Sequence, residues 1–249
     1  MSINGPNTPI VNARIAYVNG LQLSWLTTTT FSMASGAASN SNDVNDITLS
    51  APVTNLITHV GVNGVDIAAA VASSFYAVYV IGDSTEYQPT ASLISLSATA
   101  PSLPFGYDMY RRVGFVLTDG SAHVLKFWQY GNGSAKDMWY DTPIATPAIT
   151  TATTYSTQSL AAGVPAIACE TFLAVDYTAN SATNILSMGP YGSIPSVAMI
   201  VFGYGVAAAQ QGMAVVPCAL NSGVPTIEHK ETSASDALAI SVSGYRDNL

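Results

Sequence analysis

Hydrophobic and polar residues alternate with a period of two along most of the chain, which is the pattern of β-strands. In LQLSWLTTTTF, the apolar side chains of Leu21, Leu23 and Trp25 fall on one face. FYAVYVIGD, which starts at Phe75, is apolar on both faces and predicts a strand that is covered on both sides. In the second half of the chain, further strands are predicted at residues 167–176, 184–188, 197–204, 212–220, 225–231 and 237–245.

The stretch FGYDMYRRVGFVLTDGSAHVLKFWQYG, residues 105–131, predicts a hairpin. Met109 to Leu117 forms the first strand, Thr118 to Ser121 contains the Asp-Gly step of a turn, and Ala122 to Tyr130 returns. Only Val65 to Ser74 could form a short helix, and its β-branched residues disfavour one. Short strands at this spacing predict an all-β fold of the β-sandwich or jelly-roll type.

The segment TPIATPAITTATTYSTQSLAAGVP, residues 142–165, is rich in Thr, Ala and Pro and is typical of a joint between domains. We therefore expect an extended N-terminal arm over residues 1–16, a first β-sandwich domain over residues 17–148 and a second over residues 149–249. The arm has little core of its own. Its apolar side chains are expected to make assembly contacts on a neighbouring subunit or an underlying shell; they are Ile3, Ile10, Val11 and Ile15.

The composition excludes several kinds of partner. Only 9% of residues are charged, against about 25% in ordinary soluble domains, and the net charge is −8. No basic residue lies between Arg14 and Arg111, so the chain can neutralise few phosphates and nucleic-acid binding is not expected. The longest apolar run, at residues 197–209, is shorter than the roughly 18 residues of a membrane span, so no membrane contact is expected. The N-terminus shows no secretory signal.

A possible nucleophile lies in Gly82-Asp83-Ser84-Thr85, which resembles the GDS block of GDSL-type esterases. In those enzymes the serine needs a histidine base from a distant Asp-x-x-His. None of the three histidines follows an aspartate at that spacing; they are His59, His123 and His229. We therefore interpret the block as a turn and expect no catalytic residues.

Other chemistry-bearing residues also have structural interpretations. Asp43 and Asp46 form a polar loop or at best a weak cation site, and Glu228 and Glu231 point to opposite faces of a strand, so both pairs are expected to be solvated surface. The histidines lack metal-ligand spacing, and no nucleotide-binding motif is present, so no metal and no cofactor is expected.

The aromatic residues and the cysteines leave alternatives open. Three tryptophans and thirteen tyrosines could furnish a platform for sugars, although core or subunit contacts are the commoner use. Cys169 and Cys218 are expected to be two buried reduced thiols, with a bridge between two strands as the alternative.

Two long segments resemble a module that recurs in structural proteins of tailed bacteriophages. They are NGLQLSW…TTTTFSMASGAASNSNDVNDITLS and FYAVYVIGDSTEYQPTASLISLSATAPSLPFGYDMYRRVGFVLTDGSAHVLKFWQYG, between Asn19 and Gly131. The second half is similar to β-sandwich ends of such proteins, less specifically, in Val164-Pro165, Pro217 and Val242 to Tyr245.

This resemblance implies a non-enzymatic virion component: an oligomeric head-decoration or cement protein, or a short head or collar fibre. The alternative is a tail-fibre or receptor-binding module that recognises a host surface glycan. The implied partners are further copies of the chain, with a trimer favoured, and other virion proteins such as major capsid, portal, collar or tail proteins. The implied location is the virion, assembled in the host cytoplasm.

Arg111 and Arg112 are the only adjacent basic pair in the chain. Alternation places Arg111 on the face of Met109, Val113 and Phe115, and Arg112 on the opposite face with Tyr110. One guanidinium must therefore enter or border an apolar face, where an unpaired charge is costly. The carboxylates nearest in sequence are Asp108 and Asp119. We predict a structural tie, internal or at a subunit boundary, with contact to a ligand or receptor as the alternative.

Overall fold

The structure, a computed structural model, describes residues 16–249 except 168, 182, 193–199 and 203–208. These residues form strands and loops with no helix, so the predicted all-β fold is confirmed. The assembly contacts predicted for the arm, at Ile3, Ile10, Val11 and Ile15, lie outside the described residues.

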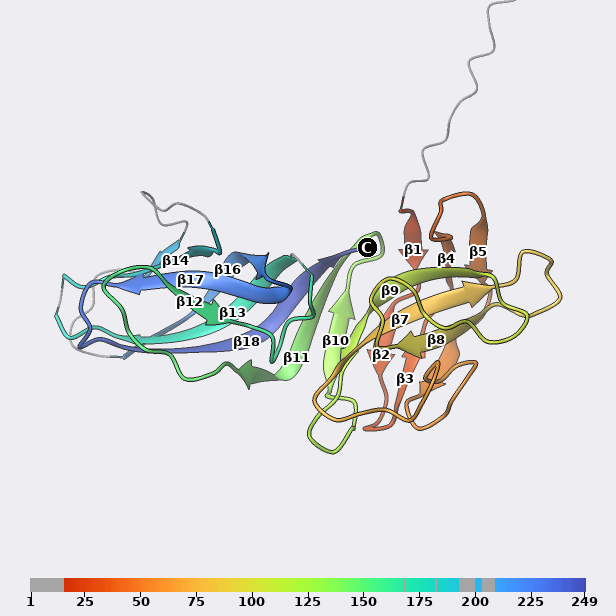
Figure 1. Cartoon of the computed structure of the whole chain (residues 1–249), viewed down its shortest axis with the longest axis horizontal. Coiled ribbons are helices and arrows are strands. Elements are labelled where there is room, and N and C mark those ends of the chain that lie inside the picture. Colours follow the sequence, from red (N-terminus) through yellow and green to blue (C-terminus); the bar gives the residue numbers. More distant parts are fainter. Residues whose placement is uncertain (1–15, 168, 182, 193–199, 203–208) are drawn as a thin grey trace, which may run out of the picture.

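The N-terminal half is a sandwich in which two sheets face one another (Figure 1). One layer contains β10 (Phe127–Tyr130), β2 (Leu23–Trp25), β3 (Thr30–Met33) and β6 (Val53–Leu56), in that order. The other contains β7 (Phe75–Gly82) between β8 (Ala91–Ser95) and β9 (Met109–Leu117). A third small sheet, at the upper end of this half in Figure 1, contains β1 (Val18–Gly20), β4 (Gly36–Ser39) and β5 (Asp46–Leu49).

The patterns around β2 and β7 are as predicted. Leu21 and Leu23 are buried, and Trp25 packs against the same core. Strand β7 is covered on both faces, because Val78 belongs to the main core while Tyr79 belongs to a second cluster. The loop between β8 and β9 helps to cover that second face with Ala98, Leu103 and Tyr107.

The C-terminal half is a second two-layered β structure. Its first layer runs from β11 (Ala135–Ala145) through β18 (Ala237–Asn248) and β13 (Cys169–Thr178) to β16 (Ala209–Asn221). The second contains β12 (Ser156–Ser159), β17 (Val224–Glu231), β14 (Leu186–Pro190) and β15 (Ile200–Phe202). Five of the six strands predicted here are present within a few residues, and most of the predicted strand at 197–204 lies outside the described residues.

One continuous sheet joins the two halves side by side (Figure 1). Strand β11 pairs with β10 through residues 137–140 and with β18 from residue 135 onward, so it belongs to both halves. One cluster of buried side chains likewise includes Leu23 and Val78 from the first half and Leu173 and Val242 from the second. The boundary expected at 148/149 follows the end of β11.

One local prediction, the hairpin, is wrong. The segment 109–130 is no hairpin, because β9 pairs with β7 in one layer while β10 pairs with β2 and β11 in the other. Pairing between the two sides of the turn is short: it consists of a bridge between Thr118 and Val124 and the adjacent backbone hydrogen bonds from Leu125 to Leu117 and from Asp119 to His123. As the β-branched residues indicated, residues 65–74 form no helix: Val65 makes isolated β-bridges and the rest forms bends and turns.

A β-bulge also changes the face assigned to Phe115. The register of β9 on β7 shifts between Arg112, opposite Tyr79, and Gly114, opposite Val78, so Val113 is the extra residue. Phe115 therefore joins the second cluster, whereas Met109 and Val113 join the main core.

Candidate functional site

Arg111 holds the loop that follows β4. Its Nε donates a hydrogen bond to the Ser39 carbonyl at 2.7 Å, and its Nη2 donates to the Ser39 hydroxyl at 3.1 Å. The same Nη2 donates to the Asn40 carbonyl and forms an ion pair with Asp43. We call Arg111, Ser39, Asn40 and Asp43 the loop clamp.

The carboxylate of the loop clamp is stabilised in its charged form. The Ser39 hydroxyl, the Ala16 amide and the Arg111 guanidinium outweigh desolvation and hold the pKa of Asp43 below its ordinary value. Asp43 has a left-handed backbone, with φ of 58°, which an aspartate tolerates better than most residues. The predicted polar loop is therefore an ordered structure.

Arg112 makes a different kind of contact. Its Nη1 donates to Asp247 Oδ2 at 2.5 Å, and its guanidinium carbon lies 4.6 Å from the centroid of the Phe115 ring. The Asp247 side chain is fully buried in β18, directly opposite Lys136 in β11. Lys136 is also fully buried and donates to the carbonyl groups of Gly20 and Leu21, each at 3.0 Å. We call Arg112, Lys136 and Asp247 the seam network.

Burial dominates the protonation of the seam network. It raises the pKa of Asp247, against the opposing effect of Arg112 and Lys136, and it lowers the pKa of Lys136 to about 8. Asp247 Oδ1 has no hydrogen-bond partner in the structure. A buried ion pair of this kind adds little net stability, but removing one of its partners is strongly destabilising.

The carboxylates predicted as partners of the arginines have other roles. Asp108 accepts hydrogen bonds from the amide of Ser84, at 2.8 Å, and from its hydroxyl. Asp119 accepts bonds from the amides of Ser121 and His123, at 2.8 and 2.9 Å, inside its own turn. The prediction of these two partners is wrong because the arginines pair with Asp43 and Asp247, which are 68 and 135 residues away.

The Gly82-Asp83-Ser84-Thr85 block is a capped turn. Asp83 accepts hydrogen bonds from the Thr85 amide and hydroxyl, at 2.8 and 2.6 Å, and from the amides of Tyr87 and Gln88, each at 3.0 Å. The Thr85 contacts are the main reason why the pKa of Asp83 lies below its ordinary value. Since Ser84 donates its hydroxyl to Asp108, the geometry agrees with the interpretation of the block as a turn.

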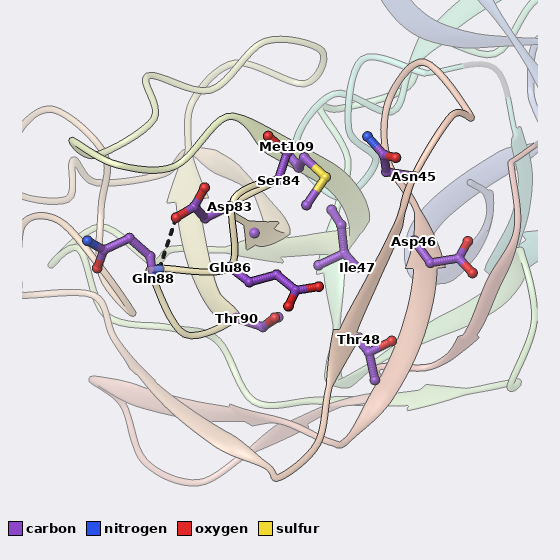
Figure 2. A pocket seen from close by; sticks show the side chains of 11 residues that line it. Asn45, Asp46, Ile47, Thr48, Asp83, Ser84, Glu86, Gln88, Thr90 and Met109 are labelled. Atoms are coloured by element: carbon purple, nitrogen blue, oxygen red, sulfur yellow. Dashed lines mark hydrogen bonds between the residues drawn. The ribbon is translucent and has the colours of Figure 1, made fainter.

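A polar cleft of about 330 Å³ lies between β5 and the loop that joins β7 to β8 (Figure 2). Its lining combines amides, hydroxyls and carboxylates with a small apolar part; the residues are Asn45, Asp46, Ile47, Thr48, Gly82, Asp83, Ser84, Glu86, Gln88, Thr90 and Met109. The loop clamp braces one wall, because Asn40 is bonded to Asn45 through their backbones at 2.8 Å. The Ser84–Asp108 contact braces the other. Arg111 and Asp108 therefore support the cleft without lining it.

The second carboxylate pair, Glu228 and Glu231, lies beside a buried histidine, His229. Glu228 and Glu231 lie on opposite faces of β17, as predicted, but Glu231 and His229 are both buried. His229 Nδ1 lies 2.8 Å from Glu231 Oε1, and Glu231 Oε2 accepts the Ala152 amide at 2.6 Å. The expectation of a solvated surface is wrong for Glu231. Within the described part of the chain, no three His, Cys, Asp or Glu side chains form a group that could hold a metal ion.

Aromatic and apolar side chains cross the outer face of the long sheet. The register aligns Trp128 in β10 with Trp139 in β11, and continues through Gly244 in β18 and Phe172 in β13 to Val215 in β16. Trp139 and Phe172 stack with their ring centroids 4.5 Å apart. They meet above Gly244, which lies between them in the register and has no side chain. We call Trp128, Trp139, Phe172 and Val215, with the adjacent Tyr130 and Met213, the outer row.

Comparisons with known proteins return no match. No family model matches the chain, and neither the curated proteins nor the solved structures include a significant match. Among the described residues, no helix is long and apolar enough to cross a membrane.

Proposed function

We propose that the protein is a non-enzymatic structural component of a tailed-bacteriophage virion. Its role is that of an oligomeric head-decoration or cement protein, or of a short head or collar fibre. The resemblance of residues 19–131 to phage structural modules supports the class of protein, and the all-β sandwich architecture fits it. The single observation that carries the proposal is the outer row.

The outer row has the composition of a protein interface. Trp128, Tyr130, Met213 and Val215 are between 42% and 58% exposed, although each is a large apolar or aromatic side chain. These side chains lie at the two ends of the row, in β10 and β16, and Phe172 between them is buried. Exposed Trp, Tyr and Met side chains are enriched in the interaction sites of soluble proteins. Polar contacts border the row, because Arg246 bonds Asp137 and Glu170 at 2.7 and 2.8 Å. An apolar centre with a charged rim is the usual arrangement of an interface.

The partners follow from the same proposal. Copies of the chain cover the outer row of their neighbours, and the phage resemblance favours a trimer. Other virion proteins, such as major capsid, portal, collar or tail proteins, provide the surface to which the oligomer attaches.

Light scattering on the purified protein tests this interface. We expect the wild-type chain to be oligomeric at micromolar concentration and the Trp128→Ser/Val215→Ser variant to be smaller, with an unchanged circular dichroism spectrum. Phe105→Ser is the matched control, because Phe105 is fully exposed on the loop between β8 and β9, away from the outer row. A monomeric wild-type chain, or equal loss of assembly in the control, contradicts the proposal.

The polar cleft favours a second candidate function, the recognition of a host surface glycan. Amides, hydroxyls and carboxylates such as those of Asn45, Thr48 and Glu86 are the groups that bond sugar hydroxyls (Figure 2). Tyr87 is 88% exposed on one loop beside the cleft, and Phe105 is fully exposed on a second. These loops touch, because an added Cβ at Gly106 would lie 2.9 Å from Gln88 Cγ. Exposed rings beside polar groups can stack on sugar faces.

Binding to host lipopolysaccharide and to purified capsular polysaccharide tests the second candidate. We expect Tyr87→Ala and Glu86→Gln to weaken binding at least about tenfold, which corresponds to roughly 1.4 kcal/mol. Tyr130→Ala, which removes an exposed ring from the outer row, leaves glycan binding unchanged. Absence of binding to either polysaccharide, or equal loss in all three variants, removes this candidate.

A further inference from the structure

The two cysteines of the chain lie directly opposite each other on neighbouring strands. Cys169 begins β13, and its register partner in the antiparallel strand β16 is Cys218. Both are free thiols, both are buried, and both side chains belong to the main core. Since opposing residues of an antiparallel pair project from the same face, the two sulphur atoms face the same space.

The backbone spacing at this position suits a disulfide. Opposing Cα atoms in antiparallel strands lie about 4.5 or 5.5 Å apart, depending on the type of pair. Disulfides are found with Cα separations of about 4.4 to 6.8 Å, so either type of pair falls within the range. The register of β13 on β16 runs without a shift from residue 169 to residue 178, whereas β13 on β18 contains a bulge. The opposition of the cysteines is therefore the end of a regular ladder.

We propose that Cys169 and Cys218 form a cross-strand dithiol that a small-molecule disulfide, such as oxidised glutathione, converts to an intramolecular disulfide. One protein thiolate attacks the oxidant, forms a mixed disulfide and releases one glutathione thiolate. The second protein thiolate then attacks the protein sulphur of the mixed disulfide, forms the Cys169–Cys218 bond and releases the second glutathione thiolate. Two protein thiols are oxidised, one glutathione disulfide is reduced, and the two protons pass to the released thiolates.

The surroundings of the thiols determine when this reaction occurs. Cys218 donates a weak hydrogen bond to the Thr226 carbonyl at 3.6 Å, and contact with Cys169 lowers the pKa of Cys218 below the ordinary value of a thiol. Contact with Cys218 and burial raise the pKa of Cys169 above the ordinary range of a thiol. Because the thiolate is the nucleophile, Cys218 is the residue that attacks first, and burial of both thiols makes the reaction of the folded dithiol slow. The bridge forms during folding under oxidising conditions or through local opening at the start of β13, where Cys169 lies.

The bridge changes stability in a defined direction. It closes the segment between residues 169 and 218 and fixes β13 against β16. Restricting the unfolded chain in this way, at this chain length, predicts a rise in Tm of roughly 5–10 °C. A protein made under reducing conditions therefore gains resistance to unfolding when it meets an oxidising medium. This inference does not depend on the proposed virion function.

Refolding from denaturant in a buffer of oxidised and reduced glutathione tests the proposal. By denaturing mass spectrometry, we expect a single chain whose mass is about 2 Da below that of the dithiol form, with residues 169 and 218 in one cross-linked peptide and no thiol open to alkylation. The Tm of this form falls to that of the reduced protein when dithiothreitol is added.

Cys169→Ala and Cys218→Ala are the controls, and their Tm should not respond to dithiothreitol. Incubating the native protein with the same glutathione buffer in mild urea repeats the test without complete unfolding. Two alkylatable thiols after both treatments, stable glutathione adducts on both cysteines, or disulfide-linked dimers on a non-reducing gel overturn the proposal.

Discussion

The loop clamp and the seam network begin at adjacent residues, yet they hold different parts of the molecule. Arg111 donates hydrogen bonds to the carbonyl and hydroxyl oxygens of Ser39 and to the carbonyl oxygen of Asn40. It also pairs with Asp43, whose side chain is 30% exposed. Arg112 reaches the C-terminal strand and pairs with Asp247, which is fully buried beside Lys136. The first contact shapes a wall of the polar cleft, and the second joins the two halves of the sheet.

The two ion pairs differ in how far their carboxylates are exposed to solvent. A partly exposed ion pair is screened and contributes little, typically 0 to about 1 kcal/mol. A buried charge that loses its partner costs about 3–5 kcal/mol, because it cannot recover its hydration. Adjacent arginines in one strand should therefore have very different effects on stability when they are replaced.

The largest effect is expected for Arg112→Ala. The change leaves Asp247 buried with Lys136 as its remaining charged neighbour, and we expect the free energy of unfolding to fall by about 3–5 kcal/mol. Urea unfolding followed by circular dichroism measures this. Arg246→Ala is the matched control, since Arg246 also pairs with two carboxylates but its side chain is 40% exposed. Equal losses of unfolding free energy for the two variants would show that burial of the seam network does not increase the cost of removing its arginine.

Gly244→Ala should have the next largest effect. An added Cβ would lie 2.0 Å from the Met138 carbonyl oxygen, and a backbone group cannot turn aside as a flexible side chain can. We expect a loss of about 3 kcal/mol in unfolding free energy, because β11 and β18 must separate at the seam. Gly120→Ala is the control, with no atom within 4 Å of the added methyl group. A stable Gly244→Ala protein would contradict the pairing of these strands.

The pH dependence of stability sharpens the comparison further. The pKa of Lys136 is about 8 in the folded protein and about 10.4 in an unfolded chain. Between these values the unfolded state binds more protons, so stability rises with pH from 8 towards 10. The wild-type protein should gain about 1–2 kcal/mol over this range relative to Lys136→Met.

Lys126→Met provides the comparison for Lys136→Met, because Lys126 is 45% exposed and pairs with Asp141 at the surface. We expect this variant to keep the rise in stability that Lys136→Met loses. Denaturant titrations at pH 8, 9 and 10 measure the difference. Parallel curves for wild type and Lys136→Met would mean that Lys136 is not desolvated in the folded protein.

The smallest effect is expected for Arg111→Ala. Its partners belong to one loop near the surface, so we expect about 1 kcal/mol of lost stability. Hydrogen exchange should become faster in residues 40–45, where the loop clamp holds the wall of the cleft, with little change in β13 or β18. A loss as large as that of Arg112→Ala, or an unchanged loop, would contradict the assigned roles.

Sequence reasoning found the strands because alternation with a period of two is a local signal. It located β7 as a strand covered on both sides and placed Glu228 and Glu231 on opposite faces of β17. It misassigned Phe115 because one bulged residue reverses the alternation. It also joined β9 and β10 into a hairpin, since the turn chemistry at Asp119 does not reveal that the strands separate into two layers.

The contacts at the site could not be predicted, because they join residues that are far apart in the sequence. Nothing near Arg111 or Arg112 in the sequence indicates Asp43 or Asp247, and nearness in sequence favoured Asp108 and Asp119 instead. The outer row and the opposition of Cys169 and Cys218 both require the strand order and the register. Residue types alone could propose aromatic contacts and a possible bridge, but not which residues meet.

The central claim is that the protein is a structural part of a virion, and immunogold electron microscopy of purified phage particles tests it most directly. With an antibody against this chain, the account predicts gold at repeated positions on intact particles, at the head or collar. Unlabelled particles, with the protein left in the soluble fraction of the lysate, would contradict it.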